Sequence, residues 1–252
     1  MRTLAFLLSF LLSVAVSAAV TIEGSDSYTD WQSEQATPSV SHTTTSATTI
    51  LIVMVFAEGT EVFDNPPTFN STSLTLISSQ STTGDNADTK MWVYGMVSPG
   101  AVTDSVAVDF SGTSSVGGIS AVNIGGTVTT SVADATNEIA NVQNTSASAT
   151  CVLASGGSSG NGLIAGFVGQ DGDSNPMTWS DSFIELRDED TGTGSQASSL
   201  GIGVAYKLSG LPSGTTVTPG ISEENSCILV ELVAAAGGGF PAAVFIQQNI
   251  VE

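Results

Sequence analysis

The sequence has one histidine, His42, in the hydroxyl-rich segment Ser41–Thr44. A serine–histidine–carboxylate triad needs a histidine as its general base, so any such triad would have to use His42. A lone histidine among small polar residues is more typical of a strand that faces solvent. We therefore expect His42 to face solvent, and we expect the protein not to be an enzyme.

Acidic loops offer the second kind of chemistry. A zinc site is excluded, because one histidine and two widely separated cysteines cannot supply its ligands, whereas calcium needs only oxygen. Two loops carry such oxygens: Glu58, Glu61 and Asp64, and later Asp171, Asp173 and Asn175. Asp171–Asn175 resembles the start of a calcium-binding loop, but Ser182 stands where such a loop has its glutamate. A Ca²⁺ site and a solvated acidic loop both stay open, and we expect no obligatory cofactor.

Paired carboxylates can also hydrolyse glycosidic bonds. The acids that could do so lie in one stretch: Asp181, Glu185, Asp188, Glu189 and Asp190. The only aromatic residues near them are Trp179 and Phe183, too few for a sugar-stacking cleft. We interpret the acids after Arg187 as a charged hairpin loop, and a glycan-active hydrolase is the third functional hypothesis.

Aromatic rings could bind sugars without catalysis, because a ring offers an apolar face to a sugar. Tyr28 and Trp31 lie in a polar N-terminal stretch, and these two are the candidate ligand-binding residues, a role that requires them to be exposed. Core packing explains Trp92 and Trp179 better. A carbohydrate-binding module, with or without Ca²⁺, is therefore the second functional hypothesis.

Two cysteines, Cys151 and Cys227, each begin an apolar run. A disulfide bond between two strand ends is one interpretation, because an exported chain meets an oxidising environment. Two buried thiols are the other.

These residues must be positioned by β-strands, because apolar residues recur at period two or in short runs rich in Val, Thr and Ser. The ten runs are Thr49–Phe56, Ser73–Ile77, Met91–Val97, Val106–Phe110, Ile119–Ile124, Thr150–Leu153, Leu163–Val168, Phe183–Leu186, Leu200–Leu208 and Cys227–Val233. They predict an all-β, antiparallel, jelly-roll-like sandwich of about ten to twelve strands. The wholly apolar run Ile50–Phe56 should lie centrally, covered on both faces.

The chain repeats itself once, with a shift of about 110 residues. The matching blocks are Leu51–Gly59 with Leu163–Asp171, Pro66–Phe69 with Pro176–Trp179, Val93–Gly100 with Gly203–Gly210, and Ile119–Val122 with Ile228–Glu231. We expect one domain, 39–236, built from halves 39–126 and 145–236 around a shared core, with 127–144 as a polar linker. Two tandem sandwiches are the alternative.

One pattern resembles a known kind of module. Its parts are a Ser/Thr-rich lead-in (Ser39–Thr49), a buried strand (Ile50–Phe56), a turn leading into Ser71–Leu76, the strand Met91–Tyr94 and the turn Val97–Gly100. The pattern is similar to the Thr/Ser/Gly/Val-rich β-sandwich modules of bacterial secreted surface proteins and of phage virion and tail-associated proteins. The resemblance implies a structural or surface-binding role and no catalytic residues.

The N-terminal residues have the pattern of an export signal. Arg2, an apolar run from Leu4 to Val16 and small residues at Ser17 and Ala18 predict a signal peptide over residues 1–18, too short to span a bilayer. A polar segment, 19–38, follows. We expect a secreted or cell-surface protein, and the leader favours the bacterial surface modules over the phage ones.

The net charge limits the classes of molecule that the protein can bind. Four cations oppose 24 acidic residues, giving a net charge of −20. Nucleic acid is excluded as a partner, because no basic patch could release counterions from phosphates. We interpret the acidity as a means of keeping an exported protein soluble.

The C-terminus ends in a detached apolar segment. A glycine hinge, Gly237–Gly239, separates the last strand from residues 240–252. The apolar members of this tail are Phe240, Val244, Phe245, Ile246 and Ile250. The tail could add as a strand to a neighbouring subunit or surface partner, or fold back on its own sandwich. A non-enzymatic structural or adhesive protein of a cell surface, matrix, filament or virion is the first functional hypothesis.

Overall fold

The computed structural model describes residues 18–59, 62–82, 89–114, 116–144, 149–170, 177–191, 200–212, 214–218 and 225–236. Regular structure in these ranges consists of antiparallel strands and one four-residue helix, α1 (Val132–Ala135). The predicted all-β, antiparallel class is confirmed. No helix in the described ranges has the length and apolar character that a membrane crossing requires.

The first half of the chain forms two sheets. The first large sheet contains β1 (Thr21–Ile22), β2 (Ser27–Trp31), β10 (Gly117–Gly125), β4 (Ile50–Glu58), β8 (Thr89–Val97) and β7 (Thr75–Thr82), with β1 and β2 both paired to β10. The first small sheet has the order β3 (Ser39–Thr43), β9 (Thr103–Phe110), β5 (Phe63–Phe69) and β6 (Thr72–Ser73).

The second half forms two more sheets. The second large sheet has the order β11 (Thr136–Asn144), β18 (Asn225–Leu232), β13 (Gly162–Gln170), β16 (Leu200–Lys207) and β15 (Ile184–Asp190). The second small sheet has the order β12 (Ala149–Val152), β17 (Gly214–Thr218) and β14 (Thr178–Trp179).

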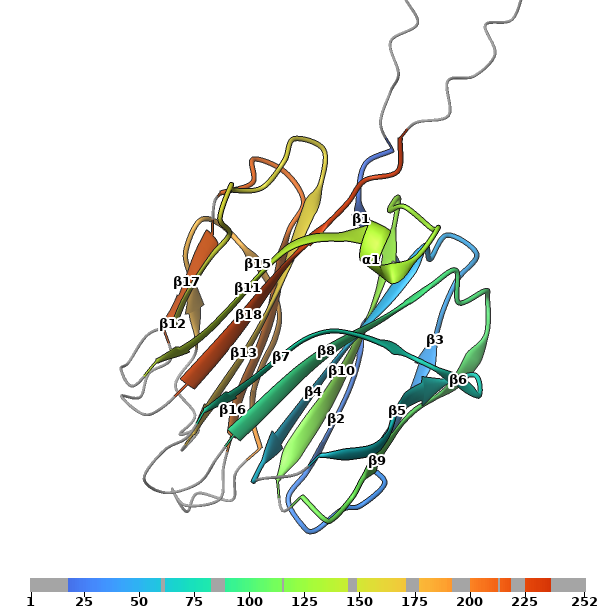
Figure 1. Ribbon diagram of the computed structural model, residues 1–252, viewed down its shortest axis with the longest axis vertical. Helices are drawn as coiled ribbons and strands as arrows, with labels where there is room; N and C mark the ends of the chain where they lie inside the picture. The colour runs from blue at the N-terminus through green and yellow to red at the C-terminus, as the bar shows by residue number, and fades with distance from the viewer. Residues whose placement is uncertain are drawn as a thin grey trace, which may run out of the picture.

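The sheets stack as four layers (Figure 1). The two large sheets face each other in the middle, and each small sheet covers the outer face of the large sheet of its own half. Three apolar clusters follow from this order: a central one between the large sheets, and one outer core under each small sheet. The expected shared core exists, and each half also has a core of its own.

Strand β4 shows how the sequence specifies the layers. Its residues from Ile50 to Ala57 are all fully buried. Ile52 and Met54 belong to the central cluster, whereas Leu51 and Val53 belong to the first outer core. Successive side chains of a strand point to opposite faces, so a wholly apolar strand fits only where both faces are covered. The predicted central position of this run is confirmed.

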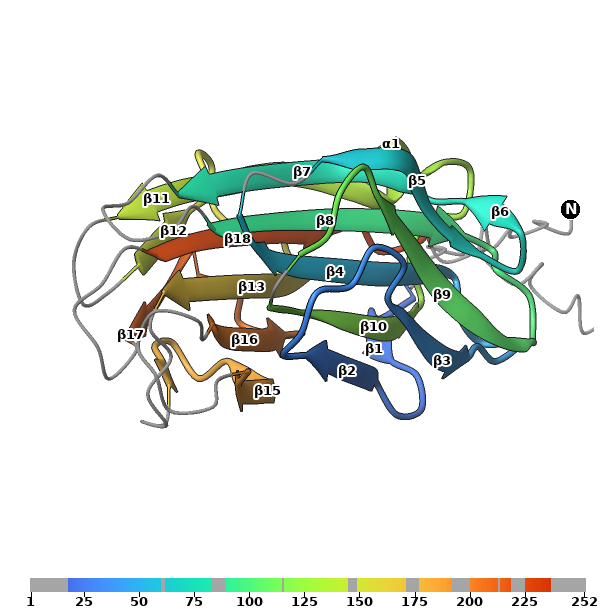
Figure 2. The same ribbon diagram turned by 90° about the horizontal axis from the view of Figure 1, so that it is seen from below.

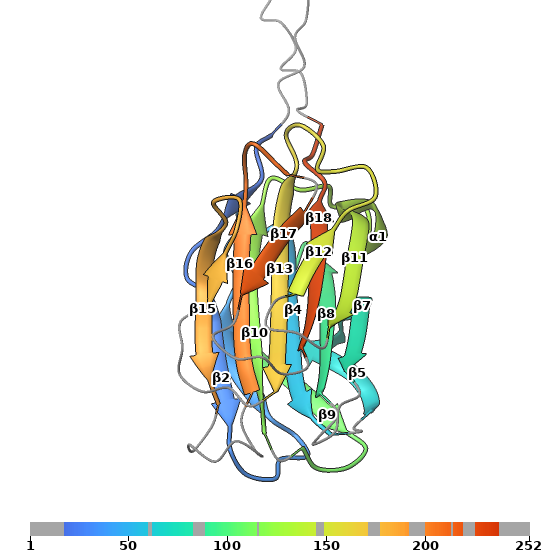
Figure 3. The ribbon, with the colours of Figure 1, turned by 90° about the vertical axis from the view of Figure 1, so that its left-hand side faces the viewer.

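The sequence repeat has a counterpart in the topology. The order β2-β10-β4-β8-β7 in the first large sheet matches β11-β18-β13-β16-β15 in the second, and β3-β9-β5 matches β12-β17-β14. The bulge between Leu76 and Ser78 on β7 has an equivalent between Glu185 and Arg187 on β15. Figure 3 shows the second half in front, with its small sheet lying across its large sheet.

The strand register corrects the alignment of two blocks. Ile52 pairs with Gly95 and Val122, and its equivalent Ile164 pairs with Tyr206 and Val230. Val122 therefore corresponds to Val230, whereas the sequence blocks set Val122 against Glu231. The block from Val93 is likewise displaced by one residue. A displacement of one residue exchanges the two faces of a strand, so only the structural register keeps core residues aligned with core residues.

Two segments expected to lie outside the halves belong to them. The polar segment 19–38 contains β1 and β2, which pair with β10. The expected linker 127–144 contains α1 and β11, and β11 pairs with β18. Ser131 caps α1, because its hydroxyl accepts a hydrogen bond from the Asp134 N–H at 3.1 Å.

Gly166 on β13 tests the contact between the large sheets. A Cβ atom there would come within 2.8 Å of the sulfur atoms of Met54 and Met91. We expect Gly166→Val to lower the free energy of unfolding by about 1–3 kcal/mol, measured by urea denaturation. Gly112→Val is the control, because the space around Gly112 is open, and its effect should stay within about 0.5 kcal/mol. Equal losses for both variants would contradict the close packing.

Candidate functional site

Arg187 bridges β15 and the start of β2, where the two halves meet at one side of the molecule. We call this contact between the halves the seam. The Arg187 Nε atom lies 2.5 Å from Asp26 Oδ2, and Nη1 lies 3.5 Å from Glu189 Oε1. The guanidinium also covers the ring of Tyr28, 5.5 Å from its centroid. Arg187 thus joins an N-terminal residue of the first half to a strand of the second.

Tyr28 is part of this seam and not an open ligand platform. Its side chain is half-buried and packs against the central cluster. Its hydroxyl is enclosed without a hydrogen-bond partner among the described residues. Burial first, and then the carboxylates of Asp30 and Glu189, raise the pKa of Tyr28, so the phenol stays protonated.

The expectation that Trp31 is exposed is wrong. Trp31 is 7% exposed and belongs to the first outer core. Its Nε1–H donates to the Ser114 carbonyl at 3.2 Å, and the absence of a side chain at Gly117 makes room for its ring. The ring therefore offers no open face to a sugar.

The other tryptophans also serve packing. Trp92 is 8% exposed and meets Phe63 edge to face at 4.7 Å. Trp179 lies over Gly203 of β16 and stacks with Phe183 at 6.3 Å. Their expected core roles agree with these contacts.

The described residues of the acidic loops form no metal centre. Within the described ranges no three histidine, cysteine or acidic residues lie close enough to hold a metal ion. Of the predicted Ca²⁺ ligands, Glu58 and Asp64 are described, whereas Glu61, Asp171, Asp173 and Asn175 lie outside the described residues. A Ca²⁺ site stays a prediction.

The acids after Arg187 lie on a strand and not in a hairpin loop. Strand β15 pairs with β16 as far as Asp190. The Asp188 carboxylate accepts a hydrogen bond from the Met177 N–H at 2.8 Å, a structural task. Glu185 is exposed as a residue. Partial desolvation of its carboxyl group is the main cause that raises the pKa of Glu185, and the nearby Asp188 carboxylate raises it further. This is a charged strand edge rather than a sugar cleft.

The expectation that His42 faces solvent is also wrong. His42 is 1% exposed and lies where β3 meets β2 and β10. Its Nδ1 lies 2.9 Å from the Ser27 hydroxyl oxygen, and its Nε2 lies 2.9 Å from Asn123 Oδ1. The alternation in Ser39–Thr43 was the available signal, because Val40 and His42 occupy the same inward face.

Asn123 fixes the protonation of the imidazole. Its Nδ2 donates to the Thr43 carbonyl at 2.8 Å, so its Oδ1 faces His42. An amide oxygen only accepts, so Nε2 of His42 carries the proton and Nδ1 accepts from Ser27. Burial is the main cause that lowers the pKa of His42, which favours this neutral form. With both nitrogens engaged, the imidazole ties β3 of the first small sheet to β2 and β10 of the first large sheet.

We expected no Gly-x-Ser-x-Gly nucleophile elbow in this sequence, but Gly156–Gly160 fits that pattern. The structure places it between strands β12 and β13, whereas an elbow joins a strand to a helix. Ser158 donates its backbone N–H to Glu231 Oε1 at 2.5 Å. His42 bonds to Ser27 and Asn123, so this histidine is not the base of Ser158.

Glu231 is a fully buried carboxylate on β18. Besides Ser158, Asn161 donates its side-chain amide to Oε1, and Asn137 donates to Oε2, both at 2.9 Å. The Asn161 side-chain oxygen in turn accepts from the Ala234 N–H at 2.9 Å. The three donors compensate the burial of the charge and attach the β12–β13 loop to the end of β18.

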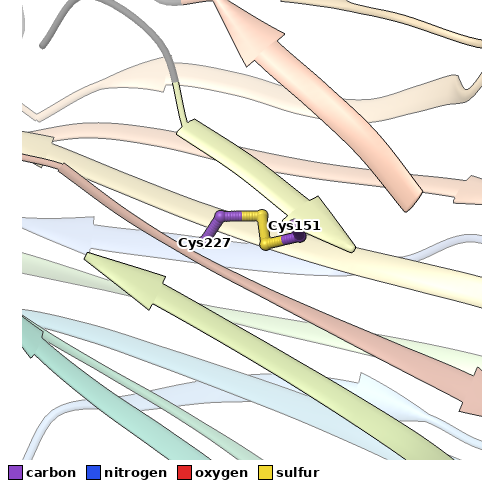
Figure 4. The surroundings of a disulfide bond; sticks show 2 residues. All are labelled: Cys151 and Cys227. Atoms are coloured by element: carbon purple, nitrogen blue, oxygen red, sulfur yellow. A yellow bond between two sulfur atoms is a disulfide. The ribbon is translucent and has the colours of Figure 1, made fainter. Parts of the chain in front are cut away.

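Cys151 and Cys227 form a disulfide bond, with Cα atoms 6.0 Å apart (Figure 4). It joins β12 of the second small sheet to β18 of the second large sheet. Both cysteines are fully buried in the outer core of the second half. The bond thus ties together the two layers of that half.

The two ends of the described chain meet at one pole of the molecule, which we name the terminal pole (Figure 1). The Ala18 N–H donates to the Ala235 carbonyl at 3.1 Å, and the Ala235 N–H donates to the Gly126 carbonyl at 2.8 Å. The tail residues Phe240, Val244, Phe245, Ile246 and Ile250 lie outside the described residues.

Two cavities are lined by uncharged residues. One, of about 340 Å³, lies between the start of β7 and α1, with Leu76, Ile77 and Val132 in its lining. The other, of about 400 Å³, has glycine-rich walls that include Gly157, Asn161 and Leu211. Neither lining contains a histidine, a cysteine or a charged residue.

Comparisons with known proteins identify no relative: no family model, no curated protein and no solved structure matches this chain.

Removing the disulfide should weaken the second half. The bond closes a loop with a sequence separation of 76 residues. We expect the double variant Cys151→Ala/Cys227→Ala to lose about 2–4 kcal/mol of unfolding free energy, because its unfolded chain is less constrained. Thermal and urea unfolding measure the loss, and wild type with a reductant should behave alike. An unchanged midpoint in both experiments would contradict a structural role.

His42 should make stability depend on pH. Since its folded pKa is below the ordinary value of 6.5, the unfolded chain takes up the proton more readily. Its contribution is complete above about pH 6.5 and is lost as the pH falls below that value. We expect a flatter profile for His42→Gln between pH 7.5 and 5.5 in urea unfolding, because carboxylates titrate alike in both proteins. Parallel profiles would show that His42 does not titrate on unfolding.

Proposed function

We propose that this chain is a non-enzymatic, exported structural or adhesive β-sandwich protein of a cell surface, extracellular matrix, filament or virion, and that it assembles through its C-terminal tail. The observation that carries the proposal is the terminal pole. Because Thr21 of β1 pairs with Gly125 and the Ala235 N–H donates to the adjacent Gly126 carbonyl, the start of the exported chain and the apolar tail leave the sandwich at the same place. An attachment made by the tail would therefore hold the molecule by one end and present the other.

The chemistry of the described residues supports a role without catalysis. Both nitrogens of His42 are engaged in hydrogen bonds, and Asp188 holds a backbone N–H. The Arg187 guanidinium is used at the seam between the halves. The residues most suited to acid–base work thus already serve the architecture.

The layered architecture suits a load-bearing part. Long antiparallel strands run along the molecule in both large sheets, and a disulfide reinforces the second half. The net charge of −20 keeps such a protein from associating non-specifically. Specific association then needs an uncharged segment, and residues 240–251 provide one.

Deleting residues 240–252 tests the proposal. We expect the full chain without its leader to form oligomers or larger assemblies, and the truncated chain to be monomeric, as measured by sedimentation velocity. The control is a full-length variant in which Val244, Phe245, Ile246 and Ile250 are replaced by serine, which keeps the length and removes the apolar surface. It should also be monomeric. A monomeric full chain, or assembly that survives both changes, would refute the role of the tail.

A further inference from the structure

The two sides of the molecule protect their sheet edges differently. Figure 2 shows β2 and β15 along one side and β7 and β11 along the other. The first side is densely charged, with Asp26, Asp30, Glu185, Arg187, Asp188, Glu189 and Asp190. Strands β7 and β11 together contain one charged residue, Glu138 of β11. Charged side chains on an edge strand normally prevent a further strand from adding to it.

We propose that the outer edge of β7 accepts the C-terminal segment of a second copy of this chain as an added antiparallel strand. The inference rests on the proposed function and specifies the acceptor surface. Strand β7 ends its sheet, since β8 is its strand partner in the described part of the chain. Its eight residues include no charged residue and no proline, two of the devices that block pairing, and a bulge interrupts its regular pairing between Leu76 and Ser78.

A hollow at the start of β7 provides a place for an apolar side chain. Leu76 is 50% exposed, and with Ile77 and Val132 it lines the cavity of about 340 Å³ between β7 and α1. Added strands gain affinity from main-chain hydrogen bonds and specificity from such pockets. An aromatic or branched side chain of the incoming strand would cover Leu76.

The tail has the matching properties. Ala243–Val251 is uncharged, free of proline, and contains Val244, Phe245, Ile246 and Ile250. Its nine residues suffice to pair with the eight residues of β7. Pairing would remove an apolar segment from water and protect an edge strand at the same time.

Strand direction identifies the donor as a second copy. Thr75, the first residue of β7, lines the hollow beside α1, and α1 adjoins the terminal pole because the Val233 N–H donates to the Ala135 carbonyl at 2.8 Å. Strand β7 therefore runs away from this pole (Figure 1). The tail of the same chain begins at the pole, and the seven residue steps from Ala236 to Ala243 extend at most about 25 Å, less than the length of about 27 Å of the eight residues of β7. Ala243 of the same chain therefore does not reach the far end of β7, so this tail could lie beside β7 only in parallel, whereas every strand pair in the described part of the chain is antiparallel.

Leu76→Lys, in the full chain without its leader, tests the acceptor. The matched control is Ile184→Lys, which places the same charge on β15, where Ile184 is 55% exposed. We expect Leu76→Lys to weaken self-association at least tenfold in sedimentation velocity, and Ile184→Lys to assemble like wild type. Thr75→Lys, at another exposed position of β7, is a second variant, and the thermal midpoints of all variants report folding.

The outcomes separate this inference from the proposed function. If both β7 variants fold and assemble like wild type while the tail deletion is monomeric, the tail binds elsewhere and the β7 acceptor is refuted. If Ile184→Lys weakens assembly as much as Leu76→Lys, added charge rather than the β7 edge is responsible, and the inference also fails. If the full chain is a monomer, the tail either folds back or does not self-associate, and both proposals fall.

Discussion

The contact between the two large sheets is the constraint on which the rest of the structure depends. Strands β4 and β13 are each buried on both faces. One face of each strand lies under a small sheet, and the opposite face lies in the central cluster. A separated half would expose the whole central face of its large sheet to water, at a cost of about 25 cal/mol for each Å² of apolar surface. The duplicated halves therefore share one central core, and Arg187 bridges them at the side where this contact ends.

Side-chain periodicity was enough to predict the class and the central strand, and matching the chain with itself predicted the repeat. A wholly apolar run such as Ile50–Phe56 has one compatible environment, so its position followed from composition alone. The register of the repeat did not follow, because a match displaced by one residue still sets Val93 against Gly203 and Ile119 against Ile228, and strands buried on both faces accept apolar residues in either register. The pairing of Ile52 with Val122, and of Ile164 with Val230, resolves this, and such pairing is known only once the strands are placed.

The candidate site was less predictable because its partners are distant in sequence. Asn123 lies 81 positions from His42, and Arg187 lies 161 positions from Asp26. Local composition made Trp31 and His42 look exposed, since small polar residues surround both. Strand alternation carried the contrary signal: Val40 and His42 share a face, and that face is buried. The polarity of neighbouring residues therefore misled where the direction of the side chain would have been informative.

The two halves have the same strand topology but are stabilised by different interactions. Val122 corresponds to Val230, so Asn123 corresponds to Glu231, and both are buried polar residues that hold neighbouring strands and loops in place. The outer core of the first half is rich in aromatic rings. The first half contains no cysteine, and its two sheets are held together by this core and by the hydrogen bonds of His42. In the second half, the disulfide bond from β12 to β18 adds a covalent link between the small and the large sheet.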